Sequence, residues 1–354
     1  MIELFESIKE RVPFTVFKVF AEQNNFPGVG RGYDGAQESL LALEEPDQSR
    51  YLRLLERFYE EHVACGEKAL VFFRCNAEEM EALRKGAVNF QPYTSPYTES
   101  YPYYLGHNEL LEAEDGPSLV AVKEKDASVD LIYATRRFFT ERVDIRPEQL
   151  VEEAQDEFSD YEKILAIRRV YRQFFDVVSV SKSTDILTLR LDSPGDMPQG
   201  ELEKAQEDMA QVTYALFGSV LSGKPPELEK VNVFPLVGAL NDSPEGRICE
   251  LGFITDGGGV KHSRMRLHNK DLRDEEYHKA GSNAATITPF KIGIRWGRKR
   301  AEEVYSNPEL FIPGKMQYVS GQKKGRQNIF KIARCVDQDD YLFVIGKVLK
   351  YLSV

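Results

Sequence analysis

The sequence predicts an α+β protein with more than one domain, and three observations support this organisation. Helical and strand patterns alternate over the first 145 residues, and strand patterns dominate after residue 230. The charge also changes sign near residue 250, because residues 1–250 contain 46 Asp and Glu against 27 Lys and Arg, whereas residues 251–354 contain 11 against 19. A chain of 354 residues exceeds the usual size of one hydrophobic core, so more than one domain is expected.

We therefore expect three parts: an acidic α/β domain at residues 1–145, a helical middle with a linker at 146–200, and a β-rich basic domain at 201–354. The acidic first part is the expected protein-interaction part. The basic last part is the expected nucleic-acid-facing part, because clustered cations attract a polyanion.

In the first part, residues 14–20 have the composition of a strand, and residues 48–63 have apolar side chains at the 3–4 spacing of an amphipathic helix. Residues 67–75 read as a buried strand. A helix is expected at 76–86, with Asn76 as its N-cap. Two further strands are expected at 117–125 and 128–145.

In the middle part, two helices are expected at 146–158 and 161–175, followed by a hairpin at 176–192. This order is compatible with a winged helix, and Arg168 and Arg172 would share one face of the second helix. The competing interpretation is an ordinary packing helix with a charged side, which the acidic helix before it favours. A long helix is then expected at 201–221.

In the basic part, residues 247–268 read as a hairpin that turns at Asp256 and three glycines. Strand alternation places His262, Arg264 and Arg266 on one face. It places Lys291 and Arg295 on one face of residues 290–297, opposite Ile292, Ile294 and Trp296. Together with the basic runs that follow, these are the candidate nucleic-acid-binding residues: His262, Arg264, Arg266, Lys291, Arg295, Arg298, Lys299, Arg300, Lys323, Lys324 and Arg326.

Lys and Arg on an extended sheet suit phosphate groups, and Arg suits them best. Two alternatives stay open for this basic face. It could be a polar face turned to water, as antiparallel sheets often have, or it could dock on an acidic protein. No nucleic-acid-binding consensus motif accompanies the charge, so low sequence specificity is expected.

A second candidate site is a loop rich in tyrosine and proline at residues 89–107. Tyrosine offers a large rigid area with a polar tip, which is common at protein interfaces. The alternatives are rings folded back on the first domain and rings that stack on bases. The candidate protein-interface residues are Tyr93, Tyr97, Tyr101, Tyr103 and Tyr104.

The preferred function is a non-catalytic, cytoplasmic nucleic-acid-binding subunit of a larger complex, such as a prokaryotic genome-maintenance or anti-phage complex. The first alternative is a metal-dependent nuclease or hydrolase with a site at 242–278, where His262, His268 and His278 lie near several acids. The second is a protein-interaction scaffold. We expect no cofactor and no resident metal, because the four cysteines have no zinc-site spacing.

The N-terminus contains acids and no apolar run before a cleavage site, so no secretory signal is expected. No apolar run approaches the ~20 residues that span a bilayer. The expected partners are DNA or RNA and either a protein or a second copy of the chain, and no membrane.

Overall fold

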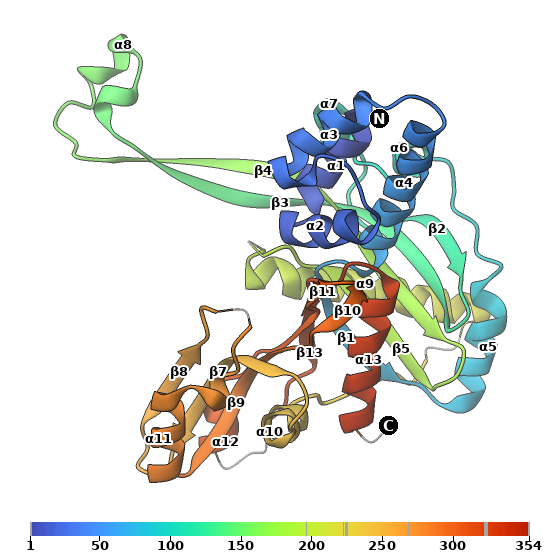
Figure 1. Ribbon diagram of the computed structural model, residues 1–354. Helices are drawn as coiled ribbons and strands as arrows, with labels where there is room; N and C mark the ends of the chain where they lie inside the picture. The colour runs from blue at the N-terminus through green and yellow to red at the C-terminus, as the bar shows by residue number, and fades with distance from the viewer. Residues whose placement is uncertain are drawn as a thin grey trace.

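A computed structural model describes residues 2–195, 197–221, 223, 226–267, 269–321 and 325–352. It confirms the α+β class: within these residues, eleven strands form one antiparallel sheet that helices cover (Figure 1). The strand order is β2-β3-β4-β5-β1-β13-β12-β9-β7-β8, and β6 also pairs with β1. The strands of this sheet are β1 (Lys68–Arg74), β2 (Ser118–Glu124), β3 (Ser128–Ile145), β4 (Ile164–Ser181), β5 (Ile186–Asp192), β6 (Glu229–Lys230), β7 (Arg247–Thr255), β8 (Val260–Arg264), β9 (Ile287–Arg295), β12 (Glu309–Ile312) and β13 (Ile329–Ala333).

Two helical layers cover opposite faces of this sheet. Successive side chains of a strand alternate between faces, and in β1 Leu70 and Phe72 belong to one core whereas Val71 and Phe73 belong to another. The first face carries α1 to α4 together with α10 and α13, and the second carries α5 and α9. The helices are α1 (Ile2–Arg11), α2 (Phe14–Gln23), α3 (Gly32–Leu41), α4 (Asp47–Cys65), α5 (Ala77–Ala87), α6 (Pro96–Ser100), α7 (His107–Glu112), α8 (Glu152–Gln155), α9 (Gln199–Val220), α10 (Pro235–Asp242), α11 (Glu276–Ala284), α12 (Gln317–Ser320) and α13 (Gln338–Leu352).

A long two-stranded arm projects from the body of the molecule (Figure 1). Strands β3 and β4 pair from Ser128 opposite Ser181 to Ile145 opposite Ile164, and the short α8 lies in the connection at the far end. The strands are buried near the body and become exposed along the arm.

The helix predicted at residues 161–175 is wrong, because most of this segment belongs to the arm. The prediction of a winged helix in the middle segment, which depended on that helix, is therefore wrong as well. Residues 164–181 form a single strand, β4. The sequence before residue 176 has apolar side chains at helical spacing, but its register with β3 continues unbroken beyond the predicted boundary. Long-range pairing has therefore overridden the local pattern.

A second correction concerns residues 14–20, which form part of α2 and not a strand. The helix buries Val16, Phe17, Phe20 and Ala21, which are spaced to lie on one helical face, although aromatic and β-branched residues favour strands. The amphipathic helix α4, the strand β1 and the long helix α9 are confirmed. Asn76 caps α5 as predicted and accepts a hydrogen bond from the backbone N–H of Glu79.

The predicted division into three parts stays a prediction. Strands from all three parts pair in the same sheet: β1 to β3 lie in the first part, β4 and β5 in the middle, and the others in the last. A small separate sheet pairs β10 (Arg298–Ala301) with β11 (Val304–Ser306).

Candidate functional site

The predicted basic hairpin exists, and its second strand forms one edge of the large sheet. Strand β8 pairs with β7 alone among the described strands, and it leaves its outer side open. His262 and Arg264 are exposed and lie opposite Gly252 and Glu250 of β7. Arg266, just beyond the strand, is also exposed. These three predicted residues are therefore brought together at the sheet edge.

The alternation predicted for β9 is also correct. Ile292, Ile294 and Trp296 are buried in the core, and Lys291 and Arg295 lie on the opposite face. Lys291 forms an ion pair with Glu250, whose other carboxylate oxygen is 3.9 Å from Arg264. An acid thus stands between the two cations that were expected to merge, and it offsets part of their charge.

Three further predicted cations form ion pairs with acids of the same chain. The Arg295 Nε atom lies 2.6 Å from a carboxylate oxygen of Glu309, and its side chain is 7% exposed. Arg298 and Arg300 both pair with Asp340, and Arg300 also pairs with Asp337. The paired acids offset the charge of these three guanidinium groups, and their nucleic-acid-binding role stays a prediction.

Two other predicted cations, Lys299 and Arg326, lie outside this cluster of ion pairs. Lys299 and Arg326 are exposed, and the Arg326 guanidinium donates to the backbone carbonyl of Lys230 at 3.2 Å. Lys323 and Lys324 lie outside the described residues, as does His268.

The tyrosine-rich loop folds back on the N-terminal core. Tyr97 is 1% exposed and donates a hydrogen bond to the backbone carbonyl of Glu114. Tyr101, Tyr103 and Tyr104 are half-buried and pack against the same core. A buried ring offers no area to a partner, so the interface prediction is wrong for Tyr97. Tyr93 is 55% exposed, and its interface role stays a prediction.

Residues 242–278 do not assemble a metal site in the described part of the chain. Asp271 pairs with Arg273, and His278 packs its ring against Phe253 with 5.6 Å between centroids. Across the described residues as a whole, no three His, Cys, Asp or Glu side chains are placed to hold a metal ion.

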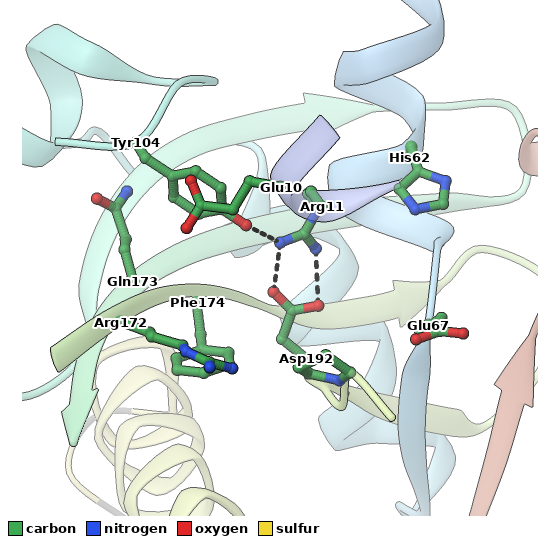
Figure 2. Close-up of a pocket in the computed structure, with 10 residues that line it drawn as sticks. Glu10, Arg11, His62, Glu67, Tyr104, Arg172, Gln173, Phe174 and Asp192 are labelled. Atoms are coloured by element: carbon green, nitrogen blue, oxygen red, sulfur yellow. Dashed lines mark hydrogen bonds and ion pairs between the residues drawn. The ribbon is translucent and has the colours of Figure 1, made fainter. Parts of the chain in front are cut away.

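A pocket of about 320 Å³ was not predicted from the sequence (Figure 2). It lies where α1, α4 and the strands β1, β4 and β5 meet. Arg11 donates two hydrogen bonds of 2.7 Å to the two carboxylate oxygens of Asp192, and a third, of 2.8 Å, to the hydroxyl of Tyr104. Lys68 lies 3.0 Å from Asp192 and donates to the backbone carbonyl of Phe175.

The buried charges shift the pKa values around this pocket. Burial acts to raise the pKa of Asp192, but the charges of Arg11 and Lys68 outweigh it and hold that pKa well below its usual range. Burial lowers the pKa of Lys68 to about 8, although Asp192 acts in the opposite direction. Burial, followed by the charges of Arg11 and Lys68, lowers the pKa of His62 to about 3, so this imidazole is neutral at neutral pH.

Several polar groups of the pocket lack a partner among the described atoms. The Gln173 side chain accepts a hydrogen bond from the backbone N–H of Leu105, but its buried Nε2 donates to nothing, and Figure 2 shows this nitrogen on the side of Tyr104. The buried Nδ1 of His62 is also unpartnered. Burial and the nearby Asp192 raise the pKa of Glu67, which also lines the pocket. A buried polar group without a partner is costly, so a bound polar molecule or water is expected to satisfy these groups.

No sequence signal marks this pocket. Its central pair joins residues 181 positions apart, and no motif contains either of them. No protein-family model and no curated protein matches the chain. In the part that the structure describes, no helix has the length and apolar character needed to cross a membrane.

Proposed function

We propose that this protein is a non-catalytic nucleic-acid-binding protein whose contact surface is the β8 edge. One observation carries the proposal. Lys261, His262, Arg264 and Arg266 are all exposed, and among the described residues only Arg264 of these four has an acidic partner within 4 Å, at the long distance of 3.9 Å. Four other cations of the region are paired with acids, namely Lys291, Arg295, Arg298 and Arg300.

The proposed contact is electrostatic and largely independent of sequence. Cations on a strand edge reach phosphate oxygens, and each phosphate neutralised releases counterions, which makes binding depend steeply on salt. No described aromatic cluster accompanies these cations to read or stack bases, so DNA and RNA are both expected ligands. The basic balance of residues 251–354 supports the same surface.

Charged side chains on an edge strand also prevent edge-to-edge pairing between molecules. That structural role requires no ligand, so the experiment must separate it from nucleic-acid binding. If β8 binds nucleic acid, changing its arginines should lower the salt-dependent affinity, whereas changing other exposed arginines should not.

The test is a fluorescence-anisotropy titration of the full chain with labelled single-stranded DNA, duplex DNA and single-stranded RNA, between about 50 and 200 mM salt. The double variant Arg264→Glu with Arg266→Glu should bind at least about tenfold more weakly, with a salt slope reduced by about two. The matched control is Arg53→Glu with Arg57→Glu, two exposed arginines of α4. Equal losses in both variants, or no binding at low salt, would refute the proposal.

We infer a second candidate function from the pocket of Figure 2, namely binding of a small zwitterion such as a free amino acid. The unpartnered Gln173 amide is a donor for an anionic group, and Glu67, for which no described ion pair exists, is an acceptor for a cationic one. A thermal-shift screen of the free amino acids tests this. A ligand that stabilises the native chain but not Glu67→Gln supports the inference, and no stabilisation by any of them rejects it.

A further inference from the structure

The projecting arm carries apolar side chains that the rest of the chain leaves exposed. On the arm strands, Val143 is 45% exposed, Leu165 is 51% exposed and Ile167 is 59% exposed. An isolated two-stranded ribbon is marginally stable in water and normally needs packing on one face. Clustered apolar side chains on such a ribbon therefore indicate a surface that a partner covers.

Leu165 and Ile167 share one face of the arm with two exposed arginines, whereas Val143, which lies opposite Ala166, is on the other face. Strand register places Arg142 opposite Ile167 and Thr140 opposite Arg169, and it places Asp144 opposite Leu165. Cross-strand partners lie on the same face, so Arg142, Arg169, Leu165 and Ile167 form one surface, the arm face. Neither arginine forms an ion pair with a described residue, and Arg169 stacks over the ring of Phe138.

The charge of the arm is divided along its length. The shaft, residues 136–145 and 164–173, contains six arginines against two acids. The tip, residues 146–163, contains seven acids against Arg146 and Lys163. All seven acids are exposed, and no salt bridge to any of them is found in the described residues. Arg136, Arg137 and Arg168 are paired with acids, so among the described residues the exposed Arg142 and Arg169 give the shaft its positive charge, and the tip is negative.

We propose that two copies of this chain associate through their arm faces in antiparallel orientation. This arrangement lays the negative tip of each copy along the positive shaft of the other. It is a two-fold, self-complementary contact, the commonest kind in homodimers. In the same arrangement the exposed Leu165 and Ile167 of each copy are covered by the arm of its partner. Nucleic acid is a poorer occupant, because the acidic tip would repel phosphates.

The decisive experiment exchanges the charges of shaft and tip in the full chain. Variant S carries Arg142→Glu and Arg169→Glu, and variant T carries Glu152→Lys, Glu153→Lys, Asp156→Lys and Glu157→Lys, which leaves three acids against six cations at the tip. Each variant alone opposes like charges and should sediment as a monomer in conditions where the native chain is a dimer. An equimolar mixture restores opposite charges at both contacts, so it should recover a dimer that contains one copy of each.

All six altered side chains are exposed, so unfolding is not expected, and circular dichroism verifies that the variants fold. The control Arg53→Glu with Arg57→Glu makes the same charge change away from the arm and should remain a dimer. A second variant, Leu165→Ser with Ile167→Ser, removes the apolar contact and should weaken the dimer at least tenfold. A monomeric native chain, or a mixture of S and T that stays monomeric while both are folded, would overturn the proposal.

Discussion

Arg11, at the end of the first helix, holds both carboxylate oxygens of Asp192, a residue 181 positions later at the end of β5. Both side chains are almost completely buried, at 7% and 5% exposure. Lys68 of β1 contacts the same carboxylate, so one buried anion ties the N-terminal helices to two neighbouring strands. The pocket of Figure 2 lies beside this junction.

Replacing Asp192 with Asn should cost about 3–5 kcal/mol of unfolding free energy, because it leaves two buried cations without their counter-charge. Urea unfolding followed by circular dichroism measures this. The control is Glu61→Gln, which breaks the pair with the exposed Arg57 and should cost less than about 1 kcal/mol. A loss below about 1 kcal/mol at Asp192 would show that the buried network contributes little.

Stability should fall as the pH drops from about 6.5 to about 3 because of His62. Its pKa is about 3 in the folded chain and about 6.5 when unfolded, so within this window the unfolded chain binds a proton that the folded chain does not. The loss from this residue approaches about 4–5 kcal/mol at about 1.4 kcal/mol per pH unit. His62→Gln should flatten the pH dependence of urea unfolding, and His107→Gln, at an exposed histidine, should not. If the unfolding free energies of the native chain and of both variants had the same pH dependence, His62 would not be the cause of the loss.

The tyrosine loop should behave as part of the core. Tyr97→Ser removes a buried ring and should lower the unfolding free energy by about 3 kcal/mol or more. Tyr93→Ser removes an exposed ring with one hydrogen bond to Ser118 and should change it by about 1 kcal/mol or less. Thermal unfolding of the free chain compares the two. If both variants lost equally little unfolding free energy, Tyr97 would again be a candidate interface residue.

The periodicity of apolar residues correctly predicted those helices and strands that are determined by residues close together in the sequence. Alternation correctly assigned Ile292 and Ile294 to the core and Lys291 to the polar face. It failed at residues 161–175, where apolar side chains at helical spacing belong to a strand whose partner ends near residue 145. A single sequence contains no signal for that register, because the pairing is determined by tertiary contacts.

The sequence predicted the exposed strand edge of the candidate site, but it did not predict which cations are paired with acids. Strand geometry brings His262 and Arg264 to one exposed edge, as expected. The counting of cations could not show which of them are neutralised, because the acids that pair with them are distant in sequence. Asp340 pairs with Arg298 and Arg300 from about forty positions away, and Arg11 and Asp192 are farther apart still. Net charge therefore located a basic region and overestimated its free charge.

The ion pairs around Asp340 lead to a last prediction, which separates folding from binding within the basic region. Asp340 is buried and accepts hydrogen bonds from Arg298, Arg300, Ser306 and the backbone N–H of Val336. These contacts hold the start of α13 against the small β10–β11 sheet. Arg300→Met leaves this buried carboxylate with fewer partners, and it should cost about 3 kcal/mol of stability.

The same Arg300→Met variant should leave the salt dependence of nucleic-acid binding unchanged, because its guanidinium is not available to phosphates. Arg266→Met should do the reverse: the exposed side chain contributes little to stability, and its loss should lower the salt slope by about one. Urea unfolding and anisotropy titration of both variants give four measurements. If Arg300→Met lowered the salt slope while stability stayed constant, the internal ion pairs would be too weak to withhold this arginine from phosphates, and the division of the basic region into paired and free cations would be wrong.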